Sequence, residues 1–591
     1  MNKLLDRVLA YPTVHKQIGK SDNPKKAQVK VEKCLNEIAA NFSKSSIKMF
    51  EKLLDASLNK LYDDINFDEG DVDFKNLVKN NSVVLVPNHQ SHADYIAINY
   101  AVFKKFGFPL YVAGGDNLNI FPLGSIFRKS GCFFIRRSFQ NDIIYRLTLE
   151  AYLSTLLEDQ LPIEFFFEGG RSRTGKLRPP KYGLYKMLLN SYYLNKSKSR
   201  KPLVFLPVSI VHEYVPETKA LANELLGGKK KKESAKDILS LLKLFARKFG
   251  NINIRLGNPI TVGEFNEETI RDFTRDLAFN CYREVGKNMI LTPSSLLSMI
   301  LLEEPTGALS WHDIVAKAET ILEFCKKFNI PLSIKLYEQE LEKILGTTVD
   351  LFIGNGKIDV LGKQEKSLLY YTIKNEARSE MLYFKNTILH HFILPYIINL
   401  GWVRIFRGEI ENFDQLRRFF LDQRKQLKHE FYLPTVENFL KKAALILSDA
   451  LGREITDFKG MFELNSKDTY AIISKVGIFG RSLSYIHEAY LISALTLKAE
   501  LQNDGDFITK NEYLSDAKEM FNERLRLGRI IRYRESLSLQ LFESALKYFV
   551  DINIISNEDN SIKLINIEKL NICINDFKKD LKDQLMINIR N

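Results

Sequence analysis

One short apolar run that ends in polar residues constrains the fold more than any other stretch of the chain. Residues 82–86 form a β-branched segment of the kind that fills the middle of a parallel sheet. Pro87 ends this segment, and His89 and Asp94 follow it. In a continuous helix, residues five apart lie roughly 140° apart around the axis. The two side chains can therefore meet only if the chain turns between them.

The His89–Asp94 spacing has two interpretations. Ser91-His92-Ala93-Asp94 has the form of a helix start, in which Asp94 is a capping carboxylate and His89 a loop residue. Alternatively, the turn brings a base and its orienting acid together. The spacing alone does not choose between a capped loop and a catalytic pair, so other stretches must decide.

The alternation of short apolar segments with helical ones predicts the fold class. Predicted strands cover residues 82–86, 109–113, 132–135, 163–167, 204–210 and 251–256, and predicted helices between them include 95–106 and 142–158. This order is typical of an α/β fold with a central, mainly parallel sheet flanked by helices. We expect an N-terminal helical region over residues 1–80, the α/β domain over 81–300 and a mainly helical domain over 301–591.

The two terminal regions show helical periodicity. The predicted helices cover residues 27–61, 314–327, 376–400, 413–428, 435–451, 491–501 and 516–550. Two glycines within residues 349–361 predict a hairpin there.

Composition narrows the class of protein without choosing a function. The net charge of +13 is compatible with nucleic acid, an anionic membrane surface or phosphorylated substrates. The five cysteines form no C-x-x-C pair, which predicts neither a disulfide framework nor a zinc site. The charged N-terminus has no signal-peptide pattern, and no stretch reaches the roughly 18 apolar residues of a spanning helix. If the protein acts on lipid, we expect it to lie on the membrane.

Polar residues follow four of the predicted strands. In an open α/β sheet, ligands bind outside the carboxyl ends of the strands, so these groups should converge. The basic residues among them indicate an anionic ligand group such as phosphate; they are Arg136, Arg137, Arg171, Arg173 and Lys176. Gly169 and Gly170 would let backbone amides approach that group closely. Surface charges paired with nearby acids are the alternative interpretation.

A nucleotide-binding loop is a competing interpretation of the glycine-rich turn. Gly170 to Lys176 fits G-x-x-x-x-G-K, but Leu177 replaces the Ser or Thr that would bind magnesium. Pro179 and Pro180 also oppose the helix that should follow directly. The pattern therefore disfavours a P-loop.

The chemistry of the pair points to direct acyl transfer. His89 is the candidate general base, and Asp94 would hold its tautomer. The chain has no G-x-S-x-G elbow, and Cys132 lies within an apolar run where a reactive thiolate is not expected. A substrate hydroxyl would then attack the acyl donor without an acyl-enzyme intermediate.

Four motifs of this chain, in order, resemble those of the glycerol-3-phosphate acyltransferase family, and most closely its bacterial membrane-associated type. The motifs are Asn88-His89-Gln90-Ser91-His92-Ala93-Asp94-Tyr95, Gly131-Cys132-Phe133-Phe134-Ile135-Arg136-Arg137, Phe167-Glu168-Gly169-Gly170-Arg171-Ser172-Arg173-Thr174-Gly175-Lys176 and Leu206-Pro207-Val208-Ser209-Ile210. The resemblance covers roughly residues 80–300 at the level of motifs, and more loosely the helical remainder.

The resemblance implies residue roles and partners. His89 and Asp94 would be the catalytic pair, Pro207 would shape the acyl pocket, and glycerol 3-phosphate would be bound by Arg136, Arg137, Glu168, Gly169, Arg171 and Ser172. The acyl donor would be a long-chain acyl-CoA or acyl carrier protein, with no metal and no further cofactor. Lys229–Lys232 is a basic cluster that could meet the donor or anionic lipid, and a solvated loop with no partner is the alternative interpretation.

The resemblance also implies a peripheral enzyme on the cytoplasmic face of the bacterial inner membrane, binding an anionic membrane surface and no nucleic acid. Two alternatives stay open. The acceptor could be dihydroxyacetone phosphate or lysophosphatidic acid, or the chain could be a non-catalytic basic protein that binds membrane or nucleic acid.

Overall fold

The structure is a computed structural model that forms two compact units. It describes residues 2–119, 123–139, 141–194, 201–228, 248–304, 307–362, 369–431, 433–456, 458, 462, 464–501, 506–530, 534–558 and 560–586. The first unit comprises Met1–Ser172, Leu177–Pro216 and Lys231–Ile290, and the second comprises Arg173–Lys176, Glu217–Lys230 and Leu291–Asn591.

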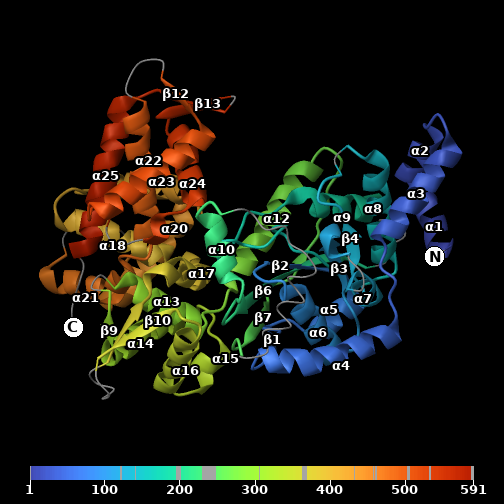
Figure 1. Cartoon of the computed structure of the whole chain (residues 1–591), viewed down its shortest axis with the longest axis horizontal. Coiled ribbons are helices and arrows are strands. Elements are labelled where there is room, and N and C mark those ends of the chain that lie inside the picture. Colours follow the sequence, from blue (N-terminus) through green and yellow to red (C-terminus); the bar gives the residue numbers. More distant parts are fainter. Residues whose placement is uncertain are drawn as a thin grey trace. The chain divides into compact units, whose positions relative to one another are not determined.

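The first unit is built on an eight-stranded sheet, which confirms the predicted α/β class. The strand order is β1-β7-β6-β2-β5-β3-β4, and β8 pairs with β6 (Figure 1). The strands are β1 (Ile65–Asp68), β2 (Ser82–Pro87), β3 (Tyr111–Gly115), β4 (Phe133–Ile135), β5 (Ile163–Glu164), β6 (Leu203–His212), β7 (Ile252–Leu256) and β8 (Ile260–Thr261). Strands β6, β2, β5, β3 and β4 run parallel, whereas β7 and β8 are antiparallel to β6.

Strand β2 lies in the middle of the sheet, between β6 and β5. All six of its residues are buried, as are all ten of β6, which explains why both read as continuous apolar runs. Pro207 is tolerated within β6 because it lies where the neighbour of β6 changes. Strand β8 pairs with Val204 and Phe205, whereas β7 pairs from Val208 onwards.

Helices cover both faces of this sheet (Figure 1). Helices α8, α9 and α12 form one core with Val84 and Val86 of β2, whereas α5 and α6 lie on the opposite side. The helices of this unit are α1 (Asn2–Leu9), α2 (Pro12–Gly19), α3 (Pro24–Ile38), α4 (Lys44–Leu61), α5 (Phe74–Asn80), α6 (Asp94–Phe106), α7 (Leu123–Lys129), α8 (Ile143–Glu158), α9 (Tyr182–Leu194) and α12 (Ile270–Lys287). Helix α8 is apolar nearly all round because α3 and α9 both pack against it.

The second unit is mainly helical, as the sequence predicts. Its helices are α10 (Thr218–Leu225), α13 (Pro293–Glu303), α14 (Trp311–Lys327), α15 (Ile334–Glu338), α16 (Leu341–Gly354), α17 (Arg378–Ile388), α18 (Ile393–Phe406), α19 (Phe413–Leu427), α20 (Val436–Leu451), α21 (Ser466–Val476), α22 (Ser484–Glu500), α23 (Lys510–Arg526), α24 (Leu539–Asp551) and α25 (Ile567–Met586). Two small antiparallel sheets join β10 (Ile358–Leu361), β11 (Tyr370–Ile373) and β9 (Leu309–Ser310), and β12 (Phe507–Thr509), β14 (Ser561–Leu564) and β13 (Ile555–Glu558).

Three long predicted helices are each split in two. The stretch 27–61 divides into α3 and α4, because Ser43 accepts a hydrogen bond from the Ser46 amide and starts a new helix. The stretch 376–400 divides into α17 and α18, because Pro395 in a continuous helix would clash with the preceding turn. The stretch 516–550 divides into α23 and α24, with Gly528 at φ 64° after the first of them.

The predicted hairpin over residues 349–361 is wrong. Helix α16 continues to Gly354, and β10 pairs instead with β11. Val349 and Phe352 are buried on the helix, and the glycines mark the turn between α16 and β10, with Gly356 at φ 68°.

None of the described helices is by itself long and apolar enough to span a membrane. One pair, Asn375–His391 with Ile393–Phe406, satisfies length and composition together, and its two halves are bent by 78°.

Candidate active site

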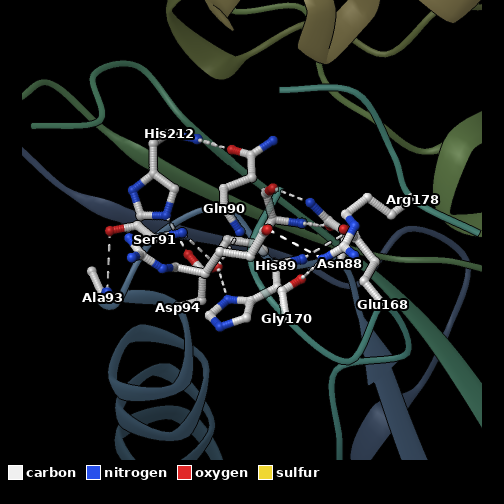
Figure 2. A network of polar contacts seen from close by, with 12 residues as sticks. Asn88, His89, Gln90, Ser91, Ala93, Asp94, Glu168, Gly170, Arg178 and His212 are labelled. Carbon is white, nitrogen blue, oxygen red and sulfur yellow. Dashed lines mark hydrogen bonds and ion pairs between the residues drawn. The ribbon is translucent and has the colours of Figure 1, made fainter. Parts of the chain in front are cut away.

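The loop between β2 and α6 carries His89 and Asp94 and is fastened to the neighbouring strand β6. Asn88 makes two hydrogen bonds with Ile210: its side-chain Nδ2 donates to the carbonyl oxygen at 3.0 Å, and its Oδ1 accepts from the amide at 2.8 Å. Gln90 Oε1 accepts from the His212 amide at 3.4 Å. Both side chains are buried, so the loop is held at the carboxyl end of the sheet (Figure 2).

The chain turns between His89 and Asp94 and brings the two side chains together. His89 Nδ1 lies 2.8 Å from Asp94 Oδ2. The same oxygen accepts hydrogen bonds from the amides of Gln90 at 2.6 Å and Ser91 at 3.0 Å. Helix α6 begins at Asp94. The two interpretations of the spacing are thus compatible, because one carboxylate organises the turn and also contacts His89.

Asp94 is a fully buried, ionised carboxylate. Burial acts to raise its pKa, but hydrogen bonds with His212 and His89 outweigh burial and hold the pKa well below its usual range. His212 Nε2 lies 2.6 Å from Oδ1. Figure 2 shows the carboxylate with the two imidazole rings on either side. His212 follows the predicted strand over residues 204–210 and lies outside the four sequence motifs.

The ring of His89 is held in place and is partly open to solvent. It stacks on Phe166, with ring centroids 4.1 Å apart and planes 26° apart. Its side chain is 13% exposed, whereas Asp94 and His212 are fully buried. The hydrogen-bond network assigns the Nδ1 proton to the contact with Asp94, which leaves Nε2 as the atom able to accept a proton.

Glu168 contacts the backbone of His89. Its Oε1 accepts from the His89 amide at 3.3 Å, and the Ser172 amide donates to the His89 carbonyl oxygen at 2.8 Å. Burial raises the pKa of Glu168 well above its usual range. The glycine-rich turn is therefore tied to the catalytic loop on both sides of His89.

The geometry of the turn is set by Gly169 and Arg178. Gly169 has φ 64°, a conformation that favours glycine. Arg178 Nη1 donates to the carbonyl oxygens of Gly170 at 3.2 Å and Arg171 at 3.4 Å. Helix α9 does not begin until Tyr182, so the turn does not lead directly into a helix N-terminus. This agrees with the prediction against a P-loop.

Arg173 and Lys176 belong to the second unit and are ion-paired there. Arg173 Nε lies 2.9 Å from Glu224 Oε2, and the buried Lys176 pairs with Glu430. Lys176 Nζ also lies 5.0 Å from the ring centroid of Phe431. Their roles in phosphate binding stay predictions.

Arg136 and Arg137, at the end of β4, differ in exposure. Arg136 is held by Glu37 of α3 through two contacts of 2.7 Å and by Asp142 at 3.1 Å. Arg137 is exposed. Arg171 and Ser172 are buried in the turn beside His89. The binding of glycerol 3-phosphate by these residues stays a prediction.

Three remaining predictions have different outcomes. Burial raises the pKa of the Cys132 thiol to about 12, which agrees with an unreactive cysteine. Pro207 pairs with Val86 of β2, and its predicted part in an acyl pocket stays a prediction. The basic cluster Lys229–Lys232 lies outside the described residues.

Comparison with known proteins identifies the family. A sequence model described as "Glycerol-3-phosphate acyltransferase C-terminal region" matches residues 221–558, and one described as "Acyltransferase" matches residues 71–211. The chain belongs to the glycerol-3-phosphate acyltransferase family. The first of these matches covers more than half of the chain, and the second includes His89, Asp94 and the glycine-rich turn.

Curated relatives carry the same name. The chain is 29% identical over 541 residues to a glycerol-3-phosphate acyltransferase of Pseudoalteromonas translucida, covering 86% of this chain and 64% of the relative. A protein of that name from Pseudomonas fluorescens is 30% identical over 395 residues, covering 64% of this chain and 46% of the relative. The chain thus spans about half to two thirds of the length of these acyltransferases.

Among solved structures, the 1-acyl-sn-glycerophosphate acyltransferase of Thermotoga maritima aligns with 47% of this chain and 94% of its own. The identity is 15% and the TM-score 0.23, which is too low to compare the two folds.

Proposed function

We propose that this chain transfers a long-chain acyl group from acyl-CoA or acyl carrier protein to the sn-1 hydroxyl of glycerol 3-phosphate. The observation that carries the proposal is His89, which is partly exposed while its Nδ1 contacts the fully buried carboxylate of Asp94. A base held in this way by an acid suits the activation of a hydroxyl group. The membership of the family supports this acceptor and this reaction.

The reaction follows from the positions of the two side chains. His89 Nε2 takes the proton of the acceptor hydroxyl as its oxygen bonds to the thioester carbonyl carbon. The tetrahedral intermediate then collapses, the carbon–sulfur bond breaks and the proton passes from His89 to the departing thiolate. Asp94 stabilises the imidazolium that exists between these steps. General base catalysis of this kind contributes about 10² to 10⁴-fold to the rate.

Recognition of the acceptor is proposed to depend on its phosphate. Arginine forks match phosphate oxygens, and Arg171 lies in the turn that is hydrogen-bonded to His89 through Ser172. Arg136 and Arg137 at the end of β4 would complete the set. Since the Arg136 guanidinium is bound to Glu37, phosphate binding at Arg136 would have to compete with that carboxylate.

The donor and the location of the enzyme are also part of the proposal. The net charge of +13 suits a donor with phosphates or an acidic carrier protein, and suits the anionic cytoplasmic face of a bacterial inner membrane. The protein would bind that surface peripherally, with no cofactor beyond the acyl donor.

The decisive experiment is a transfer assay with radiolabelled glycerol 3-phosphate, the purified chain, and either acyl-CoA or acyl carrier protein. Wild-type protein should form labelled 1-acylglycerol 3-phosphate, and His89→Ala should lose at least about 10²-fold in kcat. Dihydroxyacetone phosphate and lysophosphatidic acid are the competing acceptors. Acylation of either one without acylation of glycerol 3-phosphate would refute this acceptor. Equal behaviour of wild type and His89→Ala would favour a non-catalytic binding protein.

A further inference from the structure

His212 is a buried histidine to which neither the motifs nor the proposed reaction assigns a task. It is the last residue of β6, it pairs with Ile252 of β7, and its side chain is fully buried. Its Nε2 lies 2.6 Å from Oδ1 of Asp94. The Asp94 carboxylate therefore connects two histidines, one partly exposed and one enclosed (Figure 2).

We propose that His212 is a positioning residue that donates its Nε2 proton to Asp94 Oδ1, and thereby orients the carboxylate that holds His89. This inference rests on the proposed function, in which His89 is the general base. His212 would touch neither the acceptor nor the donor, and would act on the reaction through Asp94 alone.

The distribution of donors around Asp94 shows why His212 is needed. Oδ2 accepts from His89 and from the amides of Gln90 and Ser91. For Oδ1, His212 is the hydrogen-bond donor that the structure shows. A fully buried carboxylate oxygen without a donor is costly, so removing His212 would favour rotation or displacement of the carboxylate. Either movement would disturb the Oδ2 contact that orients His89.

The surroundings of His212 indicate which of its nitrogens carries the proton. Its Nδ1 is buried and has no hydrogen-bond partner among the described residues. Placing a proton there would bury an unpaired N–H group, whereas a proton on Nε2 is satisfied by Asp94. The favoured tautomer carries its proton on Nε2.

The backbone of β6 at and near His212 is hydrogen-bonded to the catalytic loop. Its backbone amide donates to Gln90 Oε1, and two residues earlier Ile210 is bound to Asn88. Strand β6 thus holds the loop by its backbone and holds Asp94 by the His212 ring. This double link makes the relative placement of β2 and β6 part of the catalytic geometry.

A matched pair of substitutions distinguishes loss of the hydrogen bond from His212 to Asp94 from a change in the packing of the side chain at position 212. In His212→Gln, the side-chain amide nitrogen can occupy the place of Nε2 and still donate to Asp94. In His212→Asn, the amide reaches only as far as Nδ1, where the structure offers no partner among the described residues. His312→Asn, at a side chain that is 93% exposed, controls for the loss of an imidazole elsewhere.

The expected result is a split between kcat and KM in the transfer assay. His212→Asn should lower kcat by roughly 10 to 100-fold, the range expected for a lost hydrogen bond to a buried charge, with KM for both substrates little changed. His212→Gln should restore most of kcat, and His312→Asn should match wild type. Equal losses in the Gln and Asn variants, or a loss confined to KM, would overturn the proposal.

A second measurement covers the case in which His212→Asn does not fold. Nitrogen-15 NMR of histidine-labelled wild type should show a protonated Nε2 and a bare Nδ1 for His212, assigned by the signal that His212→Gln lacks. A proton on Nδ1 would overturn the proposal. If wild type acylates no acceptor, the proposed function fails, while this spectrum still tests the hydrogen bond to Asp94.

Discussion

The guanidinium of Arg136 is bound by both carboxylate oxygens of Glu37, with each nitrogen–oxygen distance at 2.7 Å. This pair ties helix α3 to the end of strand β4, where the second motif of the chain ends. An arginine expected to bind phosphate therefore already has an anionic partner from within the first unit. The pair is about one-third exposed, so its own contribution to stability is small, on the order of 0–1 kcal/mol.

Competition between Glu37 and the substrate phosphate for Arg136 can be tested by a substitution that removes the charge of Glu37. If Arg136 takes the phosphate, Glu37→Gln should lower KM for glycerol 3-phosphate by roughly two- to fivefold, because a charge-assisted contact no longer competes. Arg136→Ala should raise KM for glycerol 3-phosphate more than for the acyl donor. Steady-state kinetics with each substrate varied would measure both effects. If neither variant changes the ratio of the two KM values, Arg136 is a structural residue that joins α3 to β4.

Asp94 should be as important for the rate as His89. In Asp94→Asn one carboxylate oxygen becomes an NH2 group, so the side chain cannot accept both from His212 and from the group of His89, Gln90 and Ser91. It also has no negative charge to stabilise the imidazolium of His89. We expect kcat to fall by about 10² to 10⁴-fold. Circular dichroism and thermal unfolding should accompany the kinetics, because Asp94 is buried and four groups contact its oxygens. A folded Asp94→Asn protein with near wild-type kcat would contradict the catalytic role.

Glu164 of β5 should make the protein less stable as pH rises. It is fully buried, and neither carboxylate oxygen has a hydrogen-bond partner among the described residues. Burial, assisted by the negative charge of Asp94, raises the pKa of Glu164 well above its usual range. Above about pH 4.3, the ordinary value, the unfolded chain is ionised at this residue while the folded chain keeps the proton. Folding then binds a proton, so the free energy of unfolding falls as pH increases.

The substitution Glu164→Gln isolates this effect, because glutamine does not ionise. The variant should gain stability relative to wild type as pH rises from about 4 to 8, and the difference should shrink in acid. Urea unfolding at several pH values measures it, with the exposed Glu319→Gln of α14 as the control. A difference that is independent of pH would mean that Glu164 is ionised in the folded protein.

Gly175 should not tolerate a side chain. Its φ is 83°, and an added Cβ would collide with the carbonyl oxygen of Tyr383, within the second unit. Gly175→Ala should lower the free energy of unfolding by about 1–3 kcal/mol, the usual cost of a strained backbone position. Gly183→Ala is the matched control, because Gly183 lies in α9 with nothing within 4 Å of an added Cβ. It should be neutral or stabilising by up to about 1 kcal/mol. Similar losses in the two variants would argue against the close approach to Tyr383.

The amino-acid sequence predicts the local structure around the site. The sequence predicts strands β2 and β6 to within two residues of their bounds, because a buried parallel strand needs a continuous apolar run. The requirement for a turn between His89 and Asp94 follows from helical geometry alone. The helical patterns do not show the break at Ser43, because serine also occurs within helices and its capping hydrogen bond is seen only in three dimensions. Pro395 is a local signal against a continuous helix, which the periodicity of its apolar neighbours obscures.

The contacts that complete the site join residues far apart in the chain. His212 meets Asp94 across 118 positions, and Glu37 meets Arg136 across 99. Neither pair has a signal in the local pattern, because each depends on the order of the strands and on which helix packs beside them. The residues thus specify a histidine and an aspartate at the end of one strand. The sheet order supplies the second histidine, because β6 lies beside β2 and ends level with the loop that carries Asp94.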